Sequence, residues 1–318
     1  MNRKRGYVCL VLAALIFSTT EVALKLQSGM FHPMQLTCER MFIAGFFLLP
    51  FALRHMKKTQ MHLGGEDFIR FALLGFFNAL SMATLQLAIL QTDASAVAIL
   101  YSGNPVFAVF LAGLLLHEKL RRNHLVALAF QLVGIVLILN PAQMEINLPG
   151  FLLALLSTLL YALYNTLCKR HADYYGSFVL TSCNLIVCAF ELLLLLLLGR
   201  WAPGAAFYRA VGLDIMADVP FLSGFTFHST LALLYVGIVV AGLGNFFTVQ
   251  TAKDTSATEA SFIYFFKPVF AAAVAATVLN EHISTHRAIG IVFFMLASAC
   301  ILLPLLRELR THAAAQNK

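Results

Sequence analysis

SATEASFIYFFKPVFAAAVAATVL, residues Ser256–Leu279, is the stretch that decides how this chain folds. It is mostly apolar and long enough to cross a bilayer core of about 30 Å as a helix that rises about 1.5 Å per residue. Near its middle stands Lys267, whose charge is costly at that depth unless it faces the protein interior or water. Pro268 follows at once, and its ring removes a backbone N–H and clashes with the carbonyl of Tyr264. We interpret this coincidence as a broken helix that faces a ligand. A tolerated kink beside a charge that is paired for packing is the alternative.

The same pattern occurs earlier in the chain. Residues 101–108, YSGNPVFA, align with residues 264–271, YFFKPVFA, at a constant offset of 163. In the same register Glu118 aligns with Glu281, so a glutamate follows each proline-bearing span. The chain is therefore predicted to contain two copies of one unit. Proline-broken spans at matched places in two halves indicate a transporter's substrate site.

The composition is that of a protein embedded in a bilayer. Of the 318 residues 60% are hydrophobic and 12% are charged, which is about half the charged fraction of a soluble domain, and the mean hydropathy is +0.82. Such a chain is predicted to be an all-α polytopic membrane protein, because helices satisfy their own backbone hydrogen bonds in lipid. None of the six cysteines forms a C-x-x-C pair, so neither a disulfide framework nor a zinc site is indicated. We expect no cofactor.

Ten spans are predicted from the apolar runs, arranged as two repeats of five. The first repeat occupies residues 1–140, the second occupies residues 141–306, and residues 307–318 form a polar tail. A longer irregular loop is expected at residues 200–227. The predicted spans are 7–26, 33–53, 68–90, 94–116, 123–140, 148–168, 177–199, 228–250, 256–279 and 286–306.

The basic residues predict the orientation of these spans. With the N-terminus inside, sixteen of the 22 lysines and arginines fall on one side of the membrane and four on the other. Cytoplasmic loops carry such an excess, so the net charge of +7 requires no nucleic-acid partner. Both termini are predicted to be cytoplasmic, in a multi-pass protein of a plasma membrane of the bacterial inner-membrane type. Because five spans per repeat is an odd number, the second repeat is predicted to be inverted.

These features together resemble the drug/metabolite transporter superfamily, EamA type. The resemblance is carried by residues Ala94–Leu139 and Thr255–Leu303, each with its proline-bearing span and following glutamate, and by Pro33-Met34-Gln35-Leu36 followed by Arg40. Phe17-Ser18 departs from the Trp-Gly that the family often has. The resemblance implies a ten-helix basket with a central cavity lined by spans one, three, four, six, eight and nine. It also implies efflux or exchange of small metabolites.

The candidate site residues are the polar and ionisable groups inside the spans. Glu21 and Arg40 are predicted at similar depths on adjacent spans, where they form either a gate or a salt bridge that only pins the two helices. Asn104 precedes the first repeat's proline as Lys267 precedes the second's. An asparagine within a span is more often a contact between helices than a ligand contact, so both interpretations stay open. The candidates for substrate binding or coupling are Lys267, Asn104, Tyr101, Tyr264, Glu21, Arg40, Asn78 and Asn245, with Pro105 and Pro268 as the helix breaks.

An enzyme is not indicated, because every histidine and aspartate lies at a span end, in a loop or in a tail, and no phosphate-binding glycine loop occurs. The sequence favours a secondary transporter, an exporter or exchanger that works by alternating access around spans four and nine. Since Lys267 would attract an anionic group, amino acids and related organic acids are the candidate substrates. The expected partners are a small-molecule substrate and the lipid bilayer, with a homodimer as one allowed assembly. A non-transporting multipass subunit or receptor-like scaffold is the alternative.

Overall fold

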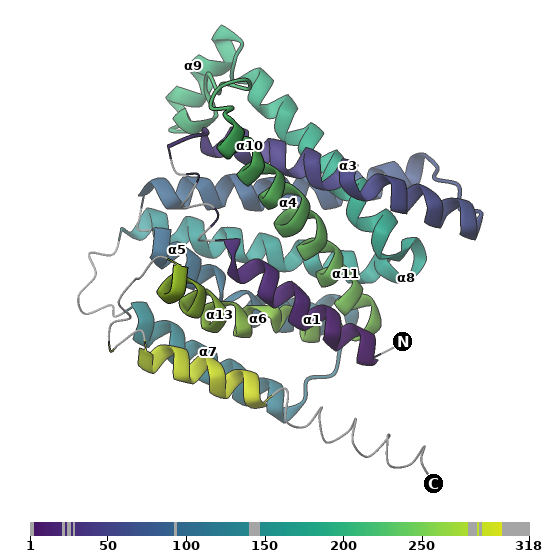
Figure 1. Ribbon diagram of the computed structural model, residues 1–318, viewed down its shortest axis with the longest axis vertical. Coiled ribbons are helices and arrows are strands. Elements are labelled where there is room, and N and C mark those ends of the chain that lie inside the picture. The colour runs from purple at the N-terminus through teal and green to yellow at the C-terminus, as the bar shows by residue number, and fades with distance from the viewer. Residues whose placement is uncertain are drawn as a thin grey trace.

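The computed structural model describes residues 3–20, 23, 27, 29–91, 94–139, 147–278, 285 and 288–300. All regular structure in these residues is helical, and the helices run side by side across the view in Figure 1. Five helical stretches among them are long and apolar enough to cross a membrane. The prediction of an all-α polytopic membrane protein is thereby confirmed.

The helices follow the predicted spans closely where the chain is described. Residues Phe227–Asp254 form one continuous apolar stretch made of α10, the π-helix η2 and α11. A further apolar helix runs from Ala288 to Cys300. The elements are α1 (Arg3–Ser18), α3 (Pro33–Thr59), α4 (Gly65–Gln91), α5 (Ala94–Tyr101), α6 (Asn104–Leu116), α7 (Arg122–Leu139), α8 (Leu148–Leu198), α9 (Ala202–Ala210), η1 (Asp214–Met216), α10 (Phe227–Leu234), η2 (Tyr235–Gly244), α11 (Asn245–Asp254), α12 (Ala257–Ser261) and α13 (Ile263–Val278).

Helix α8 combines the predicted sixth and seventh spans. It has 51 residues, which is far more than one crossing needs, and its backbone departs from helical geometry at Gly176, where φ is 74° and ψ is 156°. A residue with a side chain is strained at this φ, and a Cβ there would also lie 2.7 Å from Nε2 of His55. Gly176 therefore marks the sharp turn between two spans that lie side by side with α4 and α3.

The fourth span is broken in two, between α5 and α6. Ser102 and Gly103 interrupt the helix, and α6 begins with Asn104 and Pro105. Proline is well placed there, because the first N–H groups of a helix have no partner within the helix. The Gln131 side chain donates a hydrogen bond to the carbonyl of Ser102. The break is thus stabilised by a contact from α7.

The ninth span is interrupted at a different place from the fourth. α12 ends at Ser261 and α13 begins at Ile263, while Pro268 lies inside α13. The break at Pro268 that the sequence repeat suggests is therefore absent, and the interruption stands at Phe262. The physical reason is that a proline removes one hydrogen bond but does not force a helix to end when the surrounding packing holds the chain in place.

The surface and the interior of the bundle differ as expected for a protein in lipid. Large apolar side chains such as Phe110 and Leu114 are more than 60% exposed. Polar side chains such as Asn104, Gln131 and Asn184 are fully buried. The polar chemistry of the chain is therefore gathered between the helices, and the candidate site must be sought there.

Candidate functional site

Four tyrosines from three parts of the chain meet in the middle of the bundle, and we call them the tyrosine cluster: Tyr101, Tyr161, Tyr164 and Tyr264. All four are buried. The Tyr161 ring centroid lies 5.3 Å from that of Tyr101, 5.6 Å from that of Tyr164 and 6.2 Å from that of Tyr264. Tyr101 and Tyr264, the two residues matched by the sequence repeat, are 6.1 Å apart and edge to face. These distances are within the range of favourable aromatic pairs.

Asparagines on neighbouring helices bind two of these hydroxyl groups. Tyr161 donates to Oδ1 of Asn245 at 3.2 Å, and Nδ2 of Asn245 donates in turn to the carbonyl of Ala241. Nδ2 of Asn184 donates to the Tyr164 hydroxyl at 2.6 Å. Asn245 is the first residue of α11 after the π-helix η2. π-helical turns inside a helix are frequent at functional sites.

Several buried polar atoms near the cluster have no hydrogen-bond partner among the described residues. They include the Tyr101 hydroxyl and the side-chain oxygens of Asn78 and Asn104. The amide nitrogen of Asn104 donates to the carbonyl of Thr158, one turn before Tyr161 in α8. A buried polar group without a partner costs about 1–3 kcal/mol, so such groups are rare unless a ligand or water satisfies them.

Arg40, about two turns into α3, is the charged group of this region. Its guanidinium interacts electrostatically with Tyr101 and Tyr161, and Nη2 contacts the sulfur of Met82 at 3.2 Å. Its Nε is buried without a partner. Among the described residues no carboxylate forms an ion pair with Arg40. A guanidinium has five donors and keeps its charge in proteins, so Arg40 can bind an anionic acceptor here.

The other predicted residues take different places. Lys267 is half-buried in α13, one turn beyond Tyr264. Its side chain interacts with at least one other group of the protein. Asn78 is buried in α4, one turn before Ser81, whose hydroxyl donates to the carbonyl of Ser157 in α8. Glu21 lies outside the described residues.

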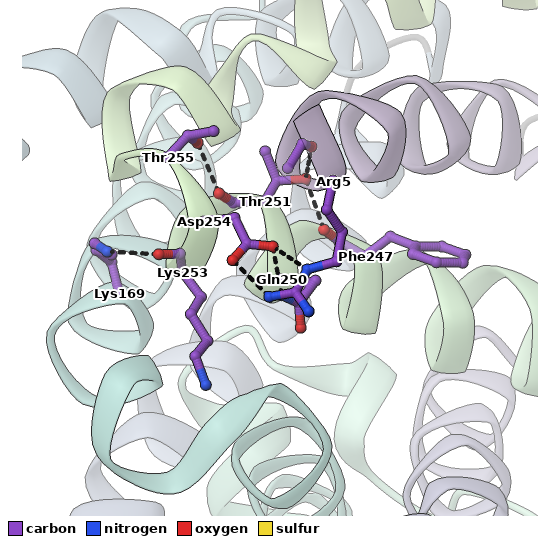
Figure 2. A network of polar contacts seen from close by, with 9 residues as sticks. Arg5, Lys169, Phe247, Gln250, Thr251, Lys253, Asp254 and Thr255 are labelled. Carbon is purple, nitrogen blue, oxygen red and sulfur yellow. Dashed lines mark hydrogen bonds and ion pairs between the residues drawn. The ribbon is translucent and has the colours of Figure 1, made fainter. Parts of the chain in front are cut away.

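A second polar region lies where α1 begins, and Figure 2 shows its centre. We call it the corner network: Arg3, Arg5, Tyr7, Gln250, Asp254 and Glu259. Arg5 binds Asp254 through two parallel hydrogen bonds of 2.6 Å and 2.7 Å. This fork geometry is the strongest form of a charge-assisted pair.

The remaining contacts of the corner network extend it to α12. Glu259 accepts from Arg3 at 3.0 Å and from the Tyr7 hydroxyl at 2.7 Å. Gln250 donates to Asp254 at 2.7 Å, and both carboxylate groups are at least 90% buried. The start of α1 is thereby tied to the corner where α11 ends and α12 begins.

Glu118, which follows α6, reinforces the same corner. Its two carboxylate oxygens accept from the backbone N–H groups of Ala257 and Thr258, at 2.8 Å and 3.1 Å. These are first-turn groups of α12, which have no partner within their own helix and which favour negative charge. The glutamate that the repeat singled out therefore joins the end of the fourth span to the start of the ninth.

Sequence reasoning missed the corner network and half of the tyrosine cluster. The sequence analysis uses the basic residues, Arg3 and Arg5 among them, for membrane orientation, and it places every aspartate, Asp254 included, at a span end, in a loop or in a tail. A signal is present in the sequence, because Ser256 and Glu259 have the spacing that begins a capped helix, two residues after Asp254. Tyr161 and Tyr164 have no such signal, since their position becomes significant only when the fourth and ninth spans are packed against α8.

Comparisons with known proteins agree with this architecture. The model of the EamA-like transporter family matches residues 4–140 and again residues 148–303. An uncharacterized transporter of Clostridium kluyveri is 32% identical over 304 residues, which are 93% of this chain and 92% of that protein. Protein PagO of Salmonella typhimurium is 25% identical and covers 88% of this chain, which spans 86% of PagO. A crystal structure of a protein with 17% identity has a TM-score of 0.73, covering 97% of this chain and 99% of that one, and it shows the fold alone.

Proposed function

The chain belongs to the EamA-like transporter family of the drug/metabolite transporter superfamily, and we propose that it is a secondary transporter whose substrate carries a carboxylate. It is a membrane transporter by family, and the proposal concerns its substrate and mechanism. We infer export or exchange by alternating access, with the tyrosine cluster as the substrate site. Amino acids and related organic acids are the substrate class.

The observation that carries this proposal is the buried guanidinium of Arg40. It lies about two turns into the membrane-spanning helix α3, interacts electrostatically with two tyrosines and has no acidic partner among the described residues. Charged groups at that depth are expensive, and they mark substrate or ion pathways. A bound carboxylate would supply the missing counter-charge through two parallel hydrogen bonds. Lys267, one turn beyond Tyr264, is the second cation for the same anionic group.

The neutral groups of the site favour a substrate with more than a carboxylate. The unpartnered oxygens of Asn78 and Asn104 accept hydrogen bonds, which an ammonium or amide of the substrate would donate. The tyrosine rings provide flat apolar walls between these polar ends. A site of this kind rejects analogues that leave its buried polar groups unpaired.

Membrane orientation is part of the proposal. We infer a plasma membrane and cytoplasmic termini from the excess of basic residues on one side. Single cysteines placed in the connection between α3 and α4, within residues 54–65, and in the segment 201–225 between α8 and α10 test this inference with an impermeant thiol reagent. The first connection is expected to react from the cytoplasmic face only and the second from the external face only. Reaction of both from one face contradicts the inverted arrangement.

The substrate is tested by a transport screen in reconstituted vesicles. Uptake and efflux of labelled amino acids, organic acids and cationic drugs are measured with and without a pH gradient. The proposal expects saturable transport of at least one carboxylate compound and none of the cationic drugs. Transport of cationic drugs alone contradicts it.

A further inference from the structure

A small pocket lies between the tyrosine cluster and the corner network. It has room for about one water molecule. At one end it is lined by Tyr264, and at the other by Ala252 and Ala257, each two residues before a carboxylate of the corner network. The complete lining consists of Asn165, Cys168, Thr248, Val249, Ala252, Ala257, Ala260, Ser261 and Tyr264.

Most of the side chains that line the pocket are small. Three of its lining residues are alanines and two more are Thr248 and Ser261. Such small side chains let helices approach one another. The walls belong to α8, α11, α12 and α13, so a modest separation of the α11–α12 corner from its neighbours would widen the whole pocket.

The corner network holds this wall in place. Residues at the start of α1 bind both carboxylates of the α11–α12 corner. Arg5 binds Asp254, and Arg3 and Tyr7 bind Glu259. The backbone of the two segments is also in close contact, because a Cβ on Gly6 would lie 2.7 Å from Cγ2 of Thr255 and 3.0 Å from Cβ of Asp254. Glu118, which follows α6, also binds the start of α12.

We propose that the pocket is the closed passage between the substrate site and the membrane face at which α1 begins, and that the corner network is the latch that keeps it closed. The inference rests on the proposed transport function for its purpose. In the state described here the latch is shut, and release of the α11–α12 corner from α1 opens the passage. Because opening breaks several charge-assisted hydrogen bonds at once, the closed state predominates.

The native residue Cys168 can be used to measure whether this passage is open, so no further cysteine has to be introduced. Its thiol lies in the pocket wall and is 1% exposed. Cys188 is fully buried elsewhere in α8 and does not line the pocket, so it is a matched internal control. An impermeant maleimide is applied to each face of vesicles that contain the full chain, and labelling of each cysteine is followed by mass spectrometry. No substrate is needed, so this measurement stands apart from the transport screen.

The latch is weakened in an Arg5→Gln and Glu259→Gln double variant. Labelling of Cys168 is expected to rise by about tenfold, from the face that carries the start of α1 only, while Cys188 stays unlabelled. Arg5→Lys alone keeps the charge and is expected to stay within about threefold of the unaltered protein, since it retains one of two bonds. Unchanged Cys168 labelling overturns the proposal. A parallel rise at Cys188, or at both faces, also overturns it, because it shows general loosening.

A reversible cross-link tests the latch with all of its charges in place. Gly6→Cys with Thr255→Cys brings two thiols together, and the second change removes the methyl group that a side chain at position 6 would meet. Oxidation is expected to abolish transport and to reduce Cys168 labelling, and reduction is expected to restore both. The reduced double variant is its own control for folding. If the fully cross-linked protein transports substrate as fast as the chemically reduced double variant does, the proposal is overturned. If the cross-link blocks Cys168 labelling but no carboxylate is transported by any form, the latch stands and the proposed substrate class fails.

Discussion

The two polar regions in the interior of this protein differ in how completely their groups are paired. In the corner network each carboxylate has a charged partner and a second donor: Asp254 has Arg5 and Gln250, and Glu259 has Arg3 and Tyr7. In the tyrosine cluster the hydroxyl of Tyr101 has no hydrogen-bond partner among the described residues, and neither has the Nε of the neighbouring Arg40. A paired network holds helices together. A buried group that has no partner among the described residues is open to a ligand from outside the protein.

The largest expected effect is at Arg40. Arg40→Met keeps much of the side chain's length but removes the charge and all donors, so transport of a carboxylate substrate is expected to fall about 100-fold or more. Initial uptake rates in vesicles measure this, with the amount of inserted protein as the reference. Arg40→Lys restores the charge without the planar fork and is expected to recover only part of the rate. Normal transport by inserted Arg40→Met protein would show that the Arg40 guanidinium does not bind the substrate.

Lys267 is expected to have the next largest effect. Lys267→Met removes the second cation near Tyr264, and we expect transport of anionic or zwitterionic substrates to be lost while the protein still inserts. Lys267→Arg is not expected to rescue it fully, because the guanidinium differs in shape from a compact ammonium. The same uptake assay measures both variants. Wild-type rates for inserted Lys267→Met protein show that this charge is structural, and the site then reduces to Arg40 and the asparagines.

The corner network is expected to show energetic coupling that the tyrosine cluster lacks. Arg5→Gln and Asp254→Asn each remove one side of the bidentate pair, and each is expected to lower the free energy of unfolding by about 2 kcal/mol. Because the two changes remove the same interaction, the double variant is expected to lose less than their sum. Thermal unfolding in detergent measures all three. Strict additivity would show that the pair seen in Figure 2 contributes no coupling.

A hydroxyl within the cluster is expected to have the smallest effect. Tyr161→Phe keeps the ring and its three aromatic neighbours but removes the bond to Asn245. A neutral hydrogen bond contributes about 1 kcal/mol, so a change of about fivefold in the substrate's KM is expected, with the protein inserted normally. Tyr161→Leu, which removes the ring, is expected to be much worse. Equal effects of the two variants would show that the hydroxyl, and not the aromatic wall, determines the site.

Much of this fold can be predicted from the sequence, because a membrane span is recognised by the apolar composition and the length of its segment. The broken fourth span could also be predicted, since Pro105 stands where a helix begins and its missing N–H costs nothing there. The ninth span could not, because whether Pro268 ends a helix depends on the packing around it. The repeat predicts which residues of the two spans match. It does not predict that the two helices are interrupted at different places.

The candidate site was predicted in part for a related reason. Tyr101 and Tyr264 could be predicted because each lies four residues before a proline, and Asn104 because it directly precedes one. Tyr161 and Asn245 belong to the site through one hydrogen bond between α8 and α11, which no local pattern encodes. Arg40 is predicted to lie at the depth of Glu21, which is outside the described residues, and the surroundings of its guanidinium depend on three-dimensional packing. Composition identifies costly groups, and only the fold shows which of them remain unsatisfied.

The most direct test of the central claim is the ratio of binding constants for a substrate and its carboxamide. Once the screen has identified a carboxylate substrate, its Kd and that of the neutral primary amide are measured on purified protein and on the Arg40→Met variant. If Arg40 binds the carboxylate, the unaltered protein is expected to prefer the acid by about 100-fold, and the variant is expected to bind both with nearly equal affinity. An unchanged ratio in Arg40→Met would contradict the claim that the Arg40 guanidinium beside the tyrosine cluster recognises the substrate.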